Sequence, residues 1–240
     1  MSGKGLRGLP NQGTMGVMKI LAVTDETVER LYALASSGHF ADVGLVLSCG
    51  DLPYPYLENI VTLLNAPLLY VPGNHDPEFD PRHANTRAEG CDNVDGRVVR
   101  ARGLTVAGLG GSPRYHPQGV NQYSPSEMTR RAWRLAASIA WNRPRLGPLD
   151  ILITHSPPLG IHDEDTQAHR GLRAINWLVG WAKPRYHLHG HVHFHRRNLT
   201  PSVTALGTTT IINVFPYQLI EINNHRFATV HLNRKARKVR

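Results

Sequence analysis

Residues 43–76 read VGLVLSCGDLPYPYLENIVTLLNAPLLYVPGNHD and contain two apolar runs on either side of a helical pattern. Residues 43–47 and 68–71 are short apolar runs bounded by turn residues, as buried strands are. Residues 56–64 carry apolar side chains three and four positions apart, which predicts a helix. Because a strand at 20–23 and a helix at 28–35 precede this stretch, the pattern is β-α-β-α-β and predicts a parallel sheet.

The rest of the chain alternates in the same way before it becomes rich in strands. Strands are predicted at 98–101 and 104–109 around the turn Arg102-Gly103, and at 151–154 and 186–188. A helix is predicted to begin at Ser124-Pro125-Ser126-Glu127, where a capping Ser precedes Pro and Glu, and another spans 172–181. Further strands are expected at 208–214, 218–222 and 227–232.

Length and charge indicate one domain with polar ends. The 240 residues suffice for one sizeable core, and we expect a flexible leader at 1–17, a single domain at 18–232 and a basic tail at 233–240. The net charge is +9, but eight of these charges lie in residues 1–19 and 233–240, so residues 20–232 carry only +1. A nearly neutral body is weak support for nucleic-acid binding.

No targeting or membrane signal stands out in this sequence. There is no apolar run of about 18 residues and no signal-peptide segment, so a cytoplasmic protein without a membrane span is expected. The two cysteines, Cys49 and Cys91, are expected to be reduced thiols.

Acids and histidines follow the predicted strands directly. Five separate segments carry them: Asp25, Gly50-Asp51, Gly73-Asn74-His75-Asp76, His155 and Gly190-His191-Val192-His193. The carboxyl ends of strands in an open α/β sheet form the crevice where ligands bind. We therefore expect these side chains to meet in one site.

The types of these side chains favour a divalent transition metal. Carboxylate and amide oxygens with imidazoles, and no thiolate, suit manganese, iron or zinc better than calcium. Asp51 is the expected bridge, since a carboxylate can hold two cations about 3.5 to 4 Å apart and such a pair makes a shared water acidic enough to supply hydroxide.

These five segments, in this order, resemble the signature of the calcineurin-like metallophosphoesterase superfamily. The resemblance covers roughly residues 18–222, and it implies a four-layer α/β/β/α sandwich of two mixed sheets. It also implies that Asp51, Asn74, His155 and His191 hold one metal, and that Asp25, Asp51 and His193 hold the other. His75 maps onto the imidazole that protonates the leaving oxygen, and Asp76 is expected to orient it.

The sequence departs from the family pattern at Thr27, where the family usually has a histidine that binds the first metal. Glu26 is adjacent, but neighbouring side chains on an extended segment point in opposite directions. A weaker or more exchangeable first metal is therefore predicted.

Ordinary explanations exist for each residue alone. An isolated Asp after a strand is commonly a helix N-cap, and a lone His is commonly a core side chain; only the joint pattern favours a metal site. The alternating histidines 187, 189, 191, 193 and 195 also fit a metal-sequestering tract. His187, His189 and His195 are interpreted as strand residues or as supports for the ligands.

Polar residues in two loops are candidates to face the site. Arg114 is the preferred phosphate clamp, because a guanidinium grips two phosphate oxygens. The remaining candidates, for which a surface loop is the equal alternative, are Tyr115, His116, His162, Asp163, Asp165 and His169.

The sequence thus predicts a metal-dependent phosphoester hydrolase, with a small phosphomonoester or phosphodiester as substrate and phosphodiesterase activity favoured. Two alternatives stay open. One is a nuclease, supported only by the basic tail and scattered arginines. The other is a non-catalytic metal-bound scaffold, against which His75 and Asp76 argue.

Overall fold

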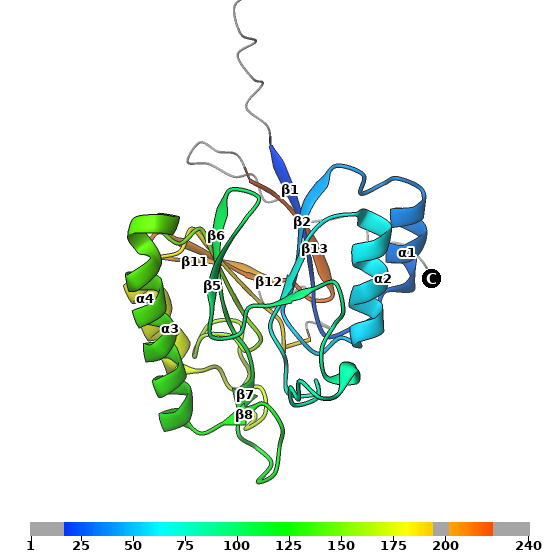
Figure 1. Cartoon of the computed structure of the whole chain (residues 1–240). Helices are drawn as coiled ribbons and strands as arrows, with labels where there is room; N and C mark the ends of the chain where they lie inside the picture. Colours follow the sequence, from blue (N-terminus) through cyan, green and yellow to red (C-terminus); the bar gives the residue numbers. More distant parts are fainter. Residues whose placement is uncertain (1–16, 194–201, 223–240) are drawn as a thin grey trace, which may run out of the picture.

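The computed structural model describes residues 17–193 and 202–222 and shows two mixed β-sheets that lie face to face, each covered on its outer side by helices (Figure 1). The first sheet has the order β13-β1-β2-β3-β4. Strands β1 to β4 are mutually parallel, and β13 is antiparallel to β1. The bounds are β1 Met18–Val23, β2 Val43–Ser48, β3 Leu68–Tyr70, β4 Asp92–Asn93 and β13 Tyr217–Ile222.

The second sheet has the order β11-β12-β10-β9-β6-β5. Its four central strands are parallel and its two edge strands are antiparallel. The bounds are β5 Val98–Ala101, β6 Leu104–Leu109, β9 Ile151–Thr154, β10 Tyr186–His189, β11 Val203–Leu206 and β12 Thr209–Asn213. A small pair, β7 Ser112–Pro113 and β8 Gln122–Tyr123, lies at the lower end in Figure 1.

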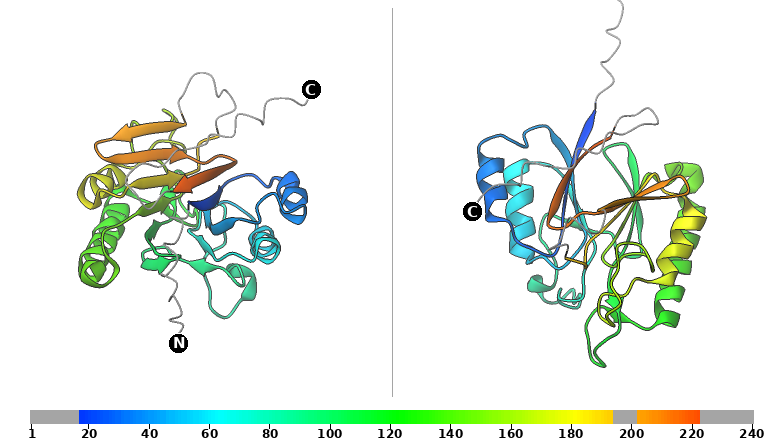
Figure 2. Two further views of the ribbon diagram at one scale, coloured as in Figure 1. Left: turned by 90° about the horizontal axis from the view of Figure 1, so that it is seen from above. Right: turned by 180° about the vertical axis from the view of Figure 1, so that it is seen from behind.

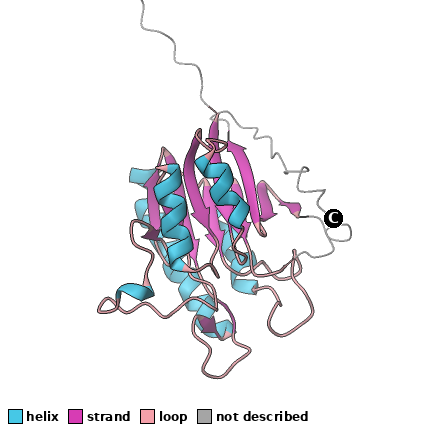
Figure 3. Ribbon diagram, turned by 90° about the vertical axis from the view of Figure 1, so that its right-hand side faces the viewer, coloured by secondary structure: helices cyan, strands magenta, loops and turns pink. Residues whose placement is uncertain are grey.

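Helices form the outer layers. α1 Glu29–Ser36 and α2 Tyr54–Leu64 cover the first sheet, and Figure 3 shows them lying over its strands. α3 Pro125–Leu146 and α4 Arg173–Ala182 cover the second sheet, and a short 3-10 turn spans Ala84–Thr86. Figure 2, seen from above, shows the two sheets enclosed between these helix pairs.

Alternation along the strands explains the four layers. Successive strand residues point to opposite faces, so Ile20 and Ala22 enter the core between the sheets while Leu21 and Val23 pack under α1 and α2. On the second sheet, Ile151 and Ile153 face the first sheet, and Leu152 packs under α3 and α4. Strands buried on both faces read as continuous apolar runs, which is the pattern seen in the sequence.

The capped helix forms as its sequence predicts. The Ser124 side chain accepts a hydrogen bond from the Glu127 amide, the Glu127 carboxylate accepts one from the Ser124 amide, and Pro125 occupies the first turn. This reciprocal cap satisfies amides that have no partner within the helix.

The predicted elements between residues 18 and 222 are present with shifts of one or two residues at their ends. The sequence did not predict β11, β4, β7 or β8; three of these are two-residue strands, too short for an apolar period. The strand predicted at 227–232, the basic tail, His195 and all but the last residue of the predicted leader lie outside the described residues. Within the described part, none of the helices combines the length and apolar character needed to cross a membrane.

Candidate metal centre

The candidate metal centre lies at the carboxyl ends of the parallel strands of both sheets. Asp25, Asp51 and Asn74 follow β1, β2 and β3 of the first sheet, whereas His155 and His191 follow β9 and β10 of the second. Backbone hydrogen bonds join the neighbouring turns, from the Asp25 amide to the Gly50 carbonyl and from the Gly190 amide to the His155 carbonyl. The site therefore bridges the two sheets.

Three of these side chains leave the backbone at strained positions. Asp25, Asp51 and His191 have φ values of 60°, 56° and 68°. Side-chain-bearing residues rarely adopt positive φ, and such strain persists where surrounding contacts enforce it, often at functional sites. Here each strained turn directs a potential ligand inward.

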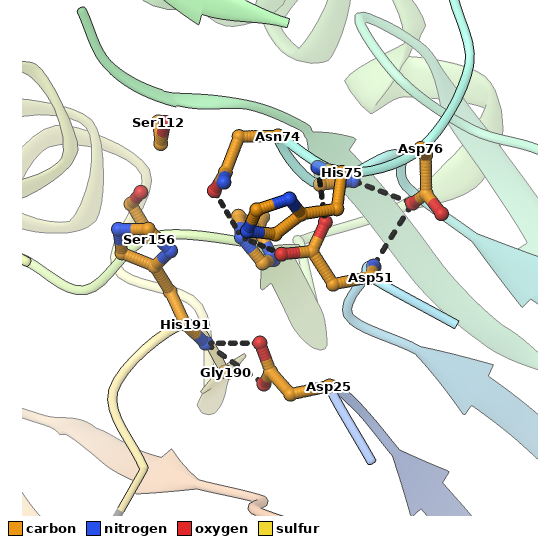
Figure 4. A network of polar contacts seen from close by, with 12 residues as sticks. Asp25, Asp51, Asn74, His75, Asp76, Ser112, Ser156, Gly190 and His191 are labelled. Carbon is orange, nitrogen blue, oxygen red and sulfur yellow. Dashed lines mark hydrogen bonds and ion pairs between the residues drawn. The ribbon is translucent and has the colours of Figure 1, made fainter. Parts of the chain in front are cut away.

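Asp51, His155 and His191 converge at the centre of the site. One ligand atom from each lies within 4.8 Å of the others. The Nε2 atom of His155 is 3.2 Å from Asp51 Oδ2 and 3.0 Å from Asn74 Oδ1, and the His155 and His191 rings are in edge contact. Figure 4 shows Asp51, Asn74 and His191 within one network of polar contacts.

Backbone carbonyls orient the two imidazoles. His155 Nδ1 lies 2.8 Å from the Cys49 carbonyl oxygen, so Nδ1 carries the donated hydrogen and Nε2 faces Asp51 and Asn74 in the site. His191 Nε2 lies 2.7 Å from the Ala168 carbonyl oxygen, which leaves Nδ1 as the donor atom for a metal. Metal-binding histidines are typically held in this way, because the second nitrogen fixes the tautomer and the ring orientation.

The Asn74 amide is oriented by a tyrosine. Its Nδ2 donates to the Tyr115 hydroxyl at 3.0 Å, which turns Oδ1 toward His155. Tyr115 is one of the loop residues that the sequence left undecided, and it lies in the wall of the metal cavity.

Asp25 and His193 line the same cavity as Asp51 and Asn74. The Asp25 carboxylate accepts hydrogen bonds from the His191 amide, at 2.9 Å for its Oδ2, and from Thr24 Oγ1 at 2.7 Å. His193 Nε2 is 3.6 Å from Asp25 Oδ1, and its ring stacks on Phe215. The assignment of both residues to the first metal stays a prediction.

Two glycines permit this close packing. A Cβ at position 73 would lie 2.0 Å from Asp51 Oδ1 and 2.7 Å from the His155 ring. A Cβ at position 190 would lie 2.0 Å from Thr24 Oγ1 and 2.3 Å from Asp25 Oδ2. No side chain fits at either place while the acids keep their positions.

The pKa shifts of Asp51, His155 and His191 show which proton a bound cation would displace. Burial would raise the pKa of Asp51, but the charge and hydrogen bond of His155 lower it to about 2. Burial would lower the pKa of His155, but Asp51 raises it to about 9. Burial lowers the pKa of His191 to about 3, so its ring stays neutral. An anionic carboxylate beside neutral or deprotonatable imidazoles is a donor set that fits a divalent transition metal.

The structure shows a different contact for Asp76 from the one expected. Its Oδ2 accepts hydrogen bonds from the amides of Gly73, at 2.7 Å, and Asp51, at 2.9 Å. Among the described residues, no contact joins its carboxylate to the His75 ring; Figure 4 shows Asp76 on the far side of Asp51 from His191. Asp76 thus positions the loop backbones, and burial raises its pKa to about 6.

His75 is an exposed histidine of the site. Its amide donates to Asp51 Oδ1 at 2.8 Å, and its side chain lines the metal cavity. This cavity has a volume of about 230 Å³, and its walls comprise Asp25, Asp51, Asn74, His75, Tyr115, Ala168, His169, His191 and His193.

Arg114 lines a different cavity from the metal cavity. Its guanidinium pairs with Glu127 at 2.9 Å and donates to the Gln122 carbonyl oxygen, and it lines a cavity between the starts of α3 and α4. The clamp role of Arg114 stays a prediction, and it would require this ion pair to open. Thr27 and Glu26 are exposed, and neither is among the residues that line the metal cavity.

Two other histidines of the tract, His187 and His189, are buried in β10 instead of forming an exposed metal-sequestering surface. His187 and His189 have no exposed surface. His187 Nε2 contacts Thr154 Oγ1, and His189 Nε2 contacts His162 Nδ1 at 3.0 Å. Cys49 is also fully buried.

Sequence reasoning missed the groups that act through the backbone. The carbonyls of Cys49 and Ala168 orient the two central imidazoles. A backbone carbonyl is common to every residue type, so no residue pattern could have identified these positions. Thr24, whose hydroxyl holds Asp25, gave only the weak signal of a polar residue at a strand end.

Comparisons with known proteins agree with this arrangement. Residues 18–195 match the family described as calcineurin-like phosphoesterase. A UPF0046 protein of Caenorhabditis elegans is 30% identical over 163 residues, which are 60% of this chain and 50% of the worm protein. Human metallophosphoesterase domain-containing protein 1 is 26% identical over 215 residues, which are 75% of this chain and 58% of the human protein. The chain thus spans little more than half the length of these relatives.

The fold also matches a solved structure. The protein TT1561 of Thermus thermophilus superposes with a TM-score of 0.60 at 18% identity, covering 89% of this chain and 98% of that one. At this identity the likeness concerns the fold. With the family match over most of the chain, it supports one conclusion: the chain belongs to the calcineurin-like phosphoesterase family.

Proposed function

We propose that this protein is a metal-dependent hydrolase of phosphate esters. Two divalent transition metal ions, manganese, iron or zinc, would be held by six side chains: Asp25, Asp51, Asn74, His155, His191 and His193. The substrate is a small phosphodiester or phosphomonoester, with a diester favoured. The convergence of Asp51, His155 and His191 within 4.8 Å carries this proposal, because the three belong to two different sheets.

Metals bound in this donor set would supply Lewis-acid stabilisation of the phosphoryl oxygens and a water of lowered pKa. The chain supplies the geometry. Asp51 is held by three contacts: its Oδ2 faces His155, its Oδ1 accepts from the His75 amide, and its own amide is held by Asp76. A carboxylate fixed in this way is suited to bridge two cations.

His75 is proposed as the proton donor to the leaving oxygen. Its backbone is tied to Asp51 while its ring is exposed at the cavity wall. An imidazole there can reach a substrate whose phosphoryl group lies over the metal ligands. General acid catalysis of this kind typically contributes roughly 10²- to 10⁴-fold to the rate.

Hydrolysis of bis(p-nitrophenyl) phosphate and p-nitrophenyl phosphate tests the proposal. The wild type, Asp51→Asn and His75→Ala proteins are assayed with manganese, iron, zinc or no metal. We expect metal-dependent turnover, loss of metal binding in Asp51→Asn, and about 10²-fold or greater loss of kcat with retained metal in His75→Ala. Bound metal without turnover of either ester would contradict the hydrolase and favour a scaffold.

A further inference from the structure

A second cavity adjoins the metal cavity on the His75 side. It has a volume of about 530 Å³ and shares Asp51 and His75 with the metal cavity. Its other walls come from the start of α2 and from residues 76–89. We call this cavity the His75 pocket.

The sizes of the two cavities suggest different occupants. The metal cavity, about 230 Å³, has room for the metal ions and a phosphoryl group. The His75 pocket, about 530 Å³, falls in the range of about 300 to 1,000 Å³ that holds organic ligands. Because His75 lies in both walls, a group leaving the phosphorus toward His75 would enter the larger cavity.

The walls of the His75 pocket are largely apolar. Leu52, Pro53 and Tyr54 form one side at the start of α2, and Pro77 and Ala84 belong to the facing segment. Burial raises the pKa of the Tyr54 phenol, which therefore stays uncharged. Such walls suit an apolar ring or another flat apolar group of a ligand.

The charge at the rim is acidic. Glu58 accepts a hydrogen bond from the Glu89 amide, and the Glu89 carboxylate pairs with Arg87 at 2.8 Å. The two glutamates and the single arginine thus give the rim a net negative charge, even without the acids of the metal centre. In contrast, the cavity at the starts of α3 and α4 is lined by Arg114, Arg170 and Arg173, and it shares no lining residue with the metal cavity.

We propose that the His75 pocket receives the leaving alcohol, and that the substrate is a phosphate ester of a neutral or cationic alcohol with an apolar ring. This inference rests on the proposed hydrolase function. Water adds its hydroxyl group to phosphorus, the bond from phosphorus to the alcohol oxygen breaks, and His75 gives that oxygen a proton, which His75 regains from water. An alcohol with further anionic groups is disfavoured by Glu58 and Glu89.

Three aryl phosphates test the charge preference: phenyl, 4-carboxyphenyl and 4-(aminomethyl)phenyl phosphate. Their phenols are similar in size and acidity, so the chemical step is matched and the charge differs. With the manganese-loaded wild type, kcat/KM is expected to be about tenfold lower for the carboxylate than for the phenyl ester, and highest for the ammonium ester.

Three variants test whether the preference for charge and size arises in the His75 pocket. Glu58→Gln is expected to narrow the ammonium-to-carboxylate ratio of kcat/KM by about two- to fivefold, as for an exposed charge. Asp165→Asn removes an equal charge from the arginine-lined cavity and is expected to leave the ratio unchanged. Ala84→Phe is expected to lower kcat/KM for 2-naphthyl phosphate relative to phenyl phosphate, because the added ring occupies the pocket.

Two negative results are distinguishable. Equal kcat/KM for all three esters in the wild type, which needs no variant to fold, would overturn the leaving-group assignment and leave the hydrolase standing. No turnover of these three esters or of bis(p-nitrophenyl) phosphate with manganese, iron or zinc would overturn both.

Discussion

Asp76 joins the two loops that carry Asp51 and Asn74. Its carboxylate is 6% exposed and receives two backbone N–H groups. His75, its neighbour, is exposed and has a chemical role in the proposal. The two adjacent residues should therefore respond differently to substitution.

Asp76→Ala is expected to lower the free energy of unfolding by about 2 kcal/mol or more, because two inward amides lose their acceptor. His75→Ala is expected to leave it within about 0.5 kcal/mol of the wild type. Urea unfolding of the metal-free proteins measures both, with Asp76→Asn as the matched variant that keeps one acceptor oxygen. A stability loss in His75→Ala as large as that in Asp76→Ala would show that this division of roles is wrong.

Thr27 stands where the family pattern has a metal-binding histidine, and Asp25, Asp51 and His193 are the remaining predicted ligands of the first metal. Thr27→His is expected to tighten binding of one of two manganese equivalents by about tenfold, since it adds an imidazole ligand. Isothermal titration measures this, with Thr27→Asn as the control of similar size. Identical isotherms for the wild type and Thr27→His would contradict the weakened first site.

The parallel strands present their carboxyl ends at one edge, and the turns that follow them carry the ligands. Because the turns contact one another closely, fewer residue types fit in the turns than in the strands. Gly190 shows this clearly, because a Cβ at this position would lie 2.0 Å from Thr24 Oγ1 and 2.3 Å from Asp25 Oδ2, which follow a strand of the other sheet.

Gly190→Ala is expected to displace Asp25 and to weaken metal binding by about tenfold or more, because the added Cβ would lie 2.3 Å from a carboxylate oxygen. Gly180→Ala in α4 is the control: nothing lies within 4 Å of its Cβ, and alanine there should raise stability by about 0.5 to 1 kcal/mol. Metal titration and thermal unfolding measure the two effects. Normal metal affinity in Gly190→Ala would show that the turn can move aside.

Among the described residues, three histidines are buried on the side of the second sheet that faces away from the first. His187 and His189 alternate in β10 with residues of the central core, and His162 closes over them from the loop after β9. Burial lowers the pKa of His187 to about 3 and that of His162 to about 4. The folded state therefore keeps these rings neutral at pH values where the unfolded chain protonates them.

Stability is expected to fall as the pH drops below about 6.5, the ordinary histidine pKa, and to keep falling toward pH 4. The sign follows because the unfolded state binds more protons than the folded state in this window. His187 alone should contribute about 2 kcal/mol of loss between pH 7 and pH 5. Urea unfolding at several pH values measures it, and His187→Gln, which cannot be protonated, should flatten the slope. Equal slopes for the two proteins would contradict the assignment.

The sequence alone determined most of the strands, the α-helices and the set of candidate ligands. Apolar runs such as residues 43–47 report burial on both faces, and the polar residue after each run marks a strand end. The resemblance then added the pairing of two sheets and the roles of the ligands. These features depend on local residue patterns or on the order of motifs, so they can be predicted from the sequence.

Only the tertiary structure decided how the ligands are held and what surrounds them. His155 and Asp51 meet because apolar residues of both sheets pack into one core, and this contact spans more than 100 positions of the chain. The Ala168 carbonyl, the amide partners of Asp76 and the pairing of Arg114 with Glu127 likewise depend on how loops pack. Side-chain patterns record burial, whereas backbone groups and loop contacts are set by the three-dimensional packing that brings distant segments together.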